Sequence, residues 1–156
     1  MKLVNVETGE KIKGRIRRLT KAQIKKLKGS KHFQFDWSLE GVNEVFAIIK
    51  ISNDELLGLI SLTDVAEELR IHINLIESAI KHQGKKKEID GIPGCLIGFA
   101  CEMSFKKGYD GFVSLTPKTR LVEYYHKKFG FLQTGVNMAV FLDISQSIIK
   151  TYLKDE

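Results

Sequence analysis

The chain has 156 residues, a length that fits one domain with a substantial buried core. Its formal net charge of +6 permits acidic partners, but a charge of this size bears on association and not on fold. Charged residues interrupt the apolar runs well before the roughly 20 residues that a membrane-spanning helix needs, and the first ten residues lack the apolar core of a signal peptide. We therefore expect a single domain over residues 1–156, in the cytoplasm and without a membrane partner.

The first forty residues predict extended chain, one short helix and an irregular connection. Residues 3–20 read as a first strand or hairpin around a turn at Thr8-Gly9. Thr20 is suited to cap a basic helix that runs to about Lys28. The segment 31–40 has no regular period, and we expect its Trp37 to be buried for packing.

Three strands follow in the sequence. Residues 44–51 and 55–63 are apolar runs separated by a short polar turn, which predicts an antiparallel hairpin. Residues 69–80 form the next strand, in which apolar and polar residues alternate as on a half-exposed surface. The alternation breaks at Leu75-Ile76, where we expect a bulge.

The second half of the chain predicts a crossover connection between parallel strands. In order, we expect a helix over 92–107, a strand over 112–117, a helix over 119–129 closed by Gly130, a hairpin around Thr134-Gly135 and a C-terminal helix from about residue 145. A strand that returns to its sheet through a helix is a right-handed βαβ unit, and the helix begins at the sheet edge where α/β folds bind ligands.

Glycines open the first of these helices. Gly91 and Gly94 permit close approach of a ligand to the backbone, and the N–H groups of a first helical turn carry roughly half a positive charge, which suits a phosphate. Three consecutive lysines, 85–87, lie just upstream. The same residues also fit an ordinary loop with solvated lysines, because loose glycine patterns occur often without a ligand.

Cys95 and Cys101 lie six residues apart on the same predicted helix. They are separated by about 9 Å along its axis and face different directions, so they should not form a disulfide. Neither has the histidine neighbours of a zinc site, so we expect two core residues and no metal.

The order of these elements, the helix opened by glycine and the Gly130-Phe131 pair after the second helix resemble the GNAT superfamily of acyl-CoA-dependent N-acyltransferases. The resemblance covers roughly residues 44–143, and the stretch 91–130 looks similar to an uncharacterised bacterial branch. It implies an α/β fold with a mixed, mainly antiparallel sheet, a βαβ cofactor crossover and flanking helices. It also implies acetyl-CoA or coenzyme A as cofactor, a small-molecule or peptide amine as acceptor, and a monomer or homodimer.

The resemblance also implies a set of cofactor-binding residues. The signature loop of the family falls on Glu88, Gly91 and Pro93, of which only the glycine matches. Proline has no N–H to donate, so Gly94 and Cys95 are expected to supply donors instead. The residues expected at the cofactor are Ile76, Ser78, Lys86, Lys87, Gly91, Ile92, Gly94 and Cys95, and Gly91→Val is expected to abolish coenzyme A binding while leaving the core intact.

Acyl transfer to an amine needs a base and a proton for the leaving thiolate. Glu77, at the end of the central strand, is the expected base, directly or through water, and Tyr125 is the expected acid with Tyr124 as its packing partner. The family places its tyrosine four residues before the glycine of the Gly-Phe pair, where this chain has His126, so His126 is an alternative for either role.

Two other functions remain open at this stage. The altered loop and displaced tyrosine also fit a GNAT-like domain that has lost catalysis and serves as an acyl-CoA-binding or interaction module. The basic segment 15–31 fits a nucleic-acid-binding domain with salt-dependent phosphate contacts. It has few aromatic residues and matches no recognition motif, which makes nucleic acid the least expected partner.

Overall fold

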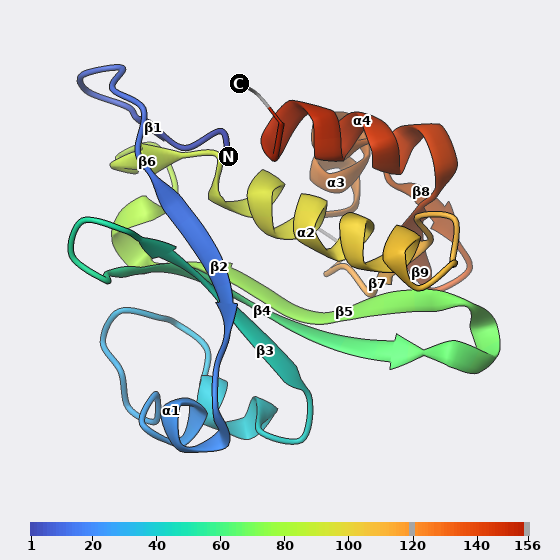
Figure 1. Ribbon diagram of the computed structural model, residues 1–156, viewed down its shortest axis with the longest axis horizontal. Coiled ribbons are helices and arrows are strands. Elements are labelled where there is room, and N and C mark those ends of the chain that lie inside the picture. Colours follow the sequence, from blue (N-terminus) through green and yellow to red (C-terminus); the bar gives the residue numbers. More distant parts are fainter. Residues whose placement is uncertain (119–120, 155–156) are drawn as a thin grey trace.

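The computed structural model describes residues 1–118 and 121–154, which form a central sheet with helices on both faces (Figure 1). The seven strands have the order β2-β3-β4-β5-β7-β9-β8. They are β2 (Gly14–Arg18), β3 (Glu44–Lys50), β4 (Leu56–Val65), β5 (Arg70–Ser78), β7 (Val113–Leu115), β8 (Leu132–Thr134) and β9 (Asn137–Val140). The helices are α1 (Lys21–Lys25), α2 (Ile92–Lys106), α3 (Val122–Phe129) and α4 (Leu142–Tyr152), and a 3-10 helix, η1, spans Trp37–Glu40.

The sheet is mixed and mainly antiparallel, as expected. Among the described strands, β5 and β7 run parallel, and the other neighbours in the sheet are antiparallel. The chain passes from β5 to β7 through α2, which confirms the βαβ crossover. It also places the start of α2 beside the end of β5, where the sequence predicted a binding site.

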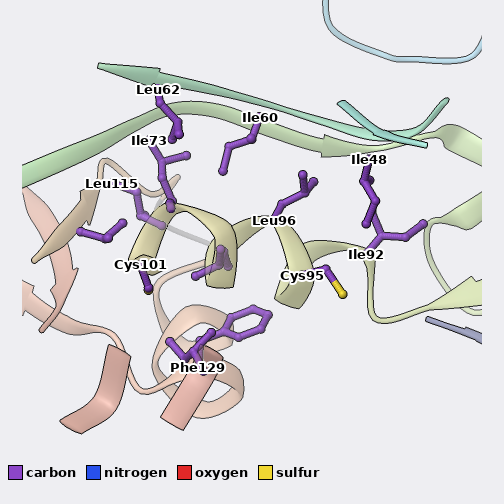
Figure 2. Close-up of a cluster of buried hydrophobic side chains, with 14 of the residues drawn as sticks. Ile48, Ile60, Leu62, Ile73, Ile92, Cys95, Leu96, Cys101, Leu115 and Phe129 are labelled. Carbon is purple, nitrogen blue, oxygen red and sulfur yellow. The ribbon is translucent and has the colours of Figure 1, made fainter. Parts of the chain in front are cut away.

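Helix α2 crosses one face of the sheet and is buried along most of its length. It begins after Gly91, which has a left-handed φ of 98°, and Pro93 is tolerated in the first turn because its missing N–H would have no partner in the helix. In Figure 2, Leu96 points from α2 toward Ile60 of β4, and Phe129 of α3 lies on the opposite side of the helix. Burial on several sides explains why α2 is apolar around most of its circumference.

The other face of the sheet is covered by α1 and η1 over its β2–β4 half (Figure 1). Trp37 is fully buried there, packed with apolar residues of β3 and β4, which confirms its expected role. Thr20 caps α1 as predicted and accepts a hydrogen bond from the Gln23 N–H, although α1 ends at Lys25, earlier than expected.

The two ends of the described chain meet at the start of α2. The N–H of Lys2 donates to the carbonyl of Tyr152 over 2.7 Å, and β1 (Val4–Asn5) pairs with β6 (Ile89–Asp90), directly before α2. The hairpin expected around Thr8-Gly9 is therefore only partly formed, with a single bridge between Val4 and Lys11. Pairing with β6 takes the place of the longer hairpin because it anchors the N-terminus on the core.

The remaining elements differ from expectation mainly at their ends. Helix α3 is described from Val122, and part of its expected first turn, Thr119 and Arg120, lies outside the described residues. Gly130 closes α3 with a left-handed φ of 82°, as predicted. Helix α4 begins at Leu142, three residues earlier than expected. Within the described residues, no helix is both long and apolar enough to cross a membrane.

Candidate active site

The parallel strands β5 and β7 separate soon after they meet. They pair at three positions, Ile71 to Ile73 against Val113 to Leu115, and β5 then continues to Ser78 while β7 ends. The register of β4 against β5 shifts so that Asn74 is an extra residue, which is the expected bulge one position earlier. The bulge and the short β7 leave one edge of β5 without a described strand partner from Asn74 onward.

A cavity of about 550 Å³ occupies this gap between the strands. On the α2 side it is lined by Gly91 and Pro93, and on the α1 side by Gln34 and Phe35. Because the sheet separates these two groups of residues, the cavity passes through it. The cavity thus has residues of both faces of the sheet in its lining.

Glu77 lies in this cavity, but its carboxylate is already surrounded by donors. Oε2 accepts from the Gln34 N–H at 2.6 Å and from Gln83 Nε2 at 3.2 Å. Oε1 accepts from the Phe35 N–H at 3.2 Å and from Trp37 Nε1 at 2.9 Å. Four donors occupy most of the lone-pair directions of a carboxylate, and the side chain is buried. Glu77 thereby ties the segment before η1 to the end of β5.

Tyr125 lines the same cavity from α3 and packs against Phe131 and Phe129. Burial, followed by interaction with Tyr124, raises the pKa of Tyr125 to about 12. Its hydroxyl therefore stays protonated near neutral pH and can donate. Tyr124 also lines the cavity and packs edge-on against Tyr125, at 5.3 Å between ring centroids, but it is exposed and lies outside the core.

Comparison with solved structures shows which known fold this arrangement has. The chain superposes on nourseothricin acetyltransferase with a TM-score of 0.60 at 14% identity, covering 82% of this chain and 98% of that one. A spermidine N-acetyltransferase SpeG chimera from Vibrio cholerae and hSSAT gives 0.61 at 15% identity, with 88% and 98% covered. The NatC complex, bound to Gag peptide and CoA, gives 0.60 at 13% identity, with 84% and 99% covered.

The chain has the GNAT acetyltransferase fold. No protein-family model matches the sequence, and no curated protein does. The fold thus follows from the strand order and crossover, while the identities of 13% to 15% leave the residues of the site to be assessed on their own geometry.

Within this GNAT fold, the expected cofactor residues divide into three groups. Ile76, Ser78, Lys87 and Gly91 line the main cavity. Gly94 lines a smaller adjoining cavity of about 190 Å³. The remaining expected residues, Lys86, Ile92 and Cys95, line neither cavity.

Cys95 does not offer the donor that the sequence suggested. Its N–H already donates to the carbonyl of Gly91 over 3.0 Å as the first intrahelical bond of α2. Its side chain is fully buried, so neither its amide nor its thiol faces a cavity. By helix geometry, Ile92 and Gly94 are the residues of the first turn whose N–H groups lack an acceptor within the helix.

Gly91 and Gly94 are in contact with the chain itself. A Cβ on Gly91 would lie 1.9 Å from the carbonyl oxygen of Lys2, and a Cβ on Gly94 would lie 2.2 Å from the ring of Tyr152. The N-terminal segment and the end of α4 therefore cover part of the first turn of α2. This contradicts the expectation that Gly91→Val would leave the core intact, because the new side chain would displace Lys2.

Lys87 is held beside the helix start by an acidic residue. Its Nζ lies 2.8 Å from Asp90 Oδ1, and this hydrogen bond lowers the pKa of Asp90 despite partial burial. Glu88 points to another lysine, with 3.6 Å between its Oε2 and Lys81 Nζ. Lys87 is thus the one lysine of the run 85–87 that lines the cavity, among the residues that the structure describes.

His126 and His82 differ in their position relative to the cavity. His126, at the position of the family tyrosine, is exposed, lies within hydrogen-bonding distance of the Phe131 carbonyl through Nδ1 at 2.9 Å, and does not line the cavity. His82 does line it and is buried, with Nε2 3.1 Å from Glu55 Oε2. Its Nδ1 has no hydrogen-bond partner among the described residues. Sequence reasoning missed His82 because a single histidine in a basic loop carries no spacing signal.

Proposed function

We propose that this protein is an acetyl-CoA-dependent N-acetyltransferase that acetylates an amine. The observation that carries the proposal is the separation of β5 from β7, which opens a cavity through the sheet in a GNAT fold. We propose a cytoplasmic protein of bacterial origin that works as a monomer or homodimer. Among the fold neighbours, the SpeG chimera is a spermidine N-acetyltransferase and the NatC complex is bound to CoA, which supports the same reaction class here.

The residues present fit the narrow arm of coenzyme A better than its pyrophosphate. The free edge of β5 from Asn74 to Ser78 offers backbone groups for the amides of the arm. At the pyrophosphate, Pro93 has no N–H and Ile92 is fully buried outside both cavities. Gly94, which lines the adjoining cavity, and Lys87 Nζ are the donors that remain. Asp90 holds Lys87 in place but also weakens the positive field there.

When bound, the cofactor supplies an activated acetyl thioester. Transfer replaces its carbon–sulfur bond by a carbon–nitrogen bond. An ammonium acceptor loses one proton to become nucleophilic and a second as the new bond forms, while one proton must reach the sulfur. In our proposal the hydroxyl of Tyr125, which lines the cavity and is protonated at neutral pH, supplies the proton to the sulfur. Both amine protons leave through water, and one of them restores the Tyr125 hydroxyl.

We assign Glu77 a positioning role in place of the general base expected from the sequence. A carboxylate that already accepts four hydrogen bonds would have to break one of them to take a proton. Its negative charge still favours a cationic amine at this end of the cavity. Glu77 therefore attracts the acceptor and fixes the segment that covers it.

A specific observation also favours a second candidate, a GNAT fold that binds acyl-CoA without catalysis or binds no cofactor. Lys2 and Tyr152 contact the first turn of α2, where the pyrophosphate would be bound. If these contacts do not give way, coenzyme A cannot seat there. Nucleic-acid binding has less support than either of these two functions. A salt titration of binding to random DNA tests it.

The first experiment measures thermal unfolding with and without acetyl-CoA, CoA and ADP at about 1 mM. A ligand at 100 times its dissociation constant stabilises the folded state by about 2.7 kcal/mol. We expect clear shifts with acetyl-CoA and CoA and a smaller shift with ADP. No shift with any of them would reject a cofactor site.

Lys87→Ala tests the proposed phosphate contact, with Lys127→Ala as its control. Both lysines form short local ion pairs, at 2.8 Å with Asp90 and at 2.9 Å with Glu123, but Lys127 lies outside the cavity. Lys87→Ala should weaken CoA binding by about tenfold because Asp90 would then face the phosphates unpaired. Equal affinities of the two variants would place the phosphates elsewhere.

Tyr125→Phe tests the proton donor. We expect kcat to fall by about 100-fold with little change in CoA binding, since general acid catalysis contributes on that order. Tyr124→Phe, the neighbouring cavity residue, should change kcat by less than about threefold. Equal effects of the two substitutions would show that packing, and not proton donation, is what Tyr125 contributes.

A further inference from the structure

At the α1 end of the cavity, Phe35 contacts both a carboxylate, Glu77, and an ammonium group, Lys118. Its backbone N–H donates to Glu77 Oε1 at 3.2 Å, and its ring lies 5.0 Å from Nζ of Lys118. All three residues line the cavity, and the Phe35 side chain is 38% exposed. The carboxylate of Glu77 is thus buried in the cavity, and the exposed Lys118 lies at its rim. Phe35 lies between them.

The two acidic residues that line the described part of the cavity are not alike. Asp90, at the α2 end, is paired with Lys87. Glu77 accepts hydrogen bonds from neutral donors, so its charge is stabilised but not cancelled. Glu77 is therefore a carboxylate at the α1 end that forms no ion pair among the described residues.

Lys118 supplies the opposite charge at this end. No carboxylate among the residues that the structure describes forms an ion pair with it, and its recorded contact is with the face of the Phe35 ring. A ring face attracts an ammonium group but leaves its N–H groups able to bind an anion. Lys118 is therefore a cation available to a ligand that enters from the α1 side.

We propose that the acceptor is a small molecule that carries both a primary amine and an anionic group, with Lys118 binding the anion. This inference rests on the proposed acetyltransferase function and specifies its substrate class. The amine is drawn inward by Glu77, while the anionic group stays at the rim beside Lys118, so the two charges of the ligand match those of the site. A polyamine would instead place its second ammonium group against Lys118, which costs affinity.

The test compares three amines that have the same carbon chain: γ-aminobutyrate, butylamine and putrescine. At the end of the carbon chain away from the reacting amine they carry an anionic, a neutral and a cationic group, respectively. The same comparison of three compounds is made with shorter carbon chains and with aromatic compounds. We expect kcat/KM to fall in that order, with at least about fivefold between the anionic and cationic members. A preference of the unmodified protein for the polyamine would overturn the inference.

Lys118→Glu should reverse the order, and Lys118→Ala should remove most of the difference. Lys150→Glu on α4 is the matched control, because it makes the same charge change on an exposed residue outside both cavities. It should leave the order unchanged. If the order of kcat/KM among the three amines is unchanged in Lys118→Glu, Lys118 does not discriminate between acceptors.

Acceptor binding is also measured by calorimetry in the presence of CoA, so the result does not depend on turnover. Binding of CoA without any discrimination between the three amines would overturn the inference and leave the cofactor site intact. Failure to bind CoA at all would overturn the proposed function itself. The two failures are therefore distinguishable.

Discussion

The carbonyl oxygen of Lys2 lies against Gly91, so close that a Cβ at position 91 would be 1.9 Å from it. Gly91 also has a φ of 98°, which residues other than glycine rarely adopt. The glycine that opens α2 thus serves two purposes, since it turns the chain into the helix and lets the N-terminal segment cross it. A pattern that suggested close approach of a ligand proves to include close approach of the chain itself.

Gly91→Ala should therefore lower the free energy of unfolding by about 3 kcal/mol or more, from backbone strain and the displaced Lys2. The control is Gly84→Ala, which has a similar left-handed φ of 71° but no atom within 4 Å of the added Cβ. It should cost only about 1 kcal/mol. Denaturant unfolding measures both, and equal losses would mean that contact with Lys2 adds nothing.

Glu77→Gln should destabilise the protein by about 1 to 3 kcal/mol, because the amide group turns a donor toward N–H groups that need an acceptor. Trp37 is the one tryptophan of the chain and donates to Glu77, so its fluorescence reports the change directly. The control Glu123→Gln removes an exposed carboxylate of α3 and should cost less than about 0.5 kcal/mol. A stable Glu77→Gln variant with unchanged fluorescence would contradict the positioning role.

Stability should fall as pH rises from about 10 to about 12. Burial raises the pKa of Tyr125 to about 12, above the ordinary tyrosine value of about 10. In this window the unfolded chain has lost the phenol proton and the folded chain keeps it, so the unfolded state gains stability with pH. Tyr125→Phe should reduce the slope of unfolding free energy against pH, and an unchanged slope would show that Tyr125 titrates normally.

The thiols should be unreactive in the folded protein. Cys95 and Cys101 are both fully buried, and burial raises the pKa of Cys101 to about 12, so little thiolate forms at neutral pH. A thiol reagent should find close to none of them in native protein and both after addition of denaturant. Rapid reaction of the native protein would contradict this burial and would also disturb any assay that follows release of the CoA thiol.

The sequence predicts the local elements well because their signals lie within a few residues of one another. Thr20 and Gln23 form a reciprocal cap, Gly130 ends α3, and the alternation of apolar residues in β5 breaks beside the bulge at Asn74. The crossover through α2 follows from the same short-range patterns, since a helix between two strands of one sheet can connect them in few ways. These features identify the fold without any long-range contact.

The candidate site was only partly predictable. Among the residues that the sequence predicted for the site, five line the cavity: Glu77, Tyr125, Ile76, Ser78 and Lys87. It could not show that three of the four donors to Glu77 come from residues 40 to 43 positions earlier.

What the sequence determined by itself is thus most of the helices and strands, their order and the position of the crossover; strand β6 and its pairing with β1 were not predicted. The tertiary structure decided what each polar group meets: Cys95 lies beside carbonyls of both chain ends, His82 meets Glu55, and Lys118 meets Phe35. The physical reason is that propensity and capping act between near neighbours. A side chain's partners across the fold depend instead on how the sheet and helices pack, which no local pattern records.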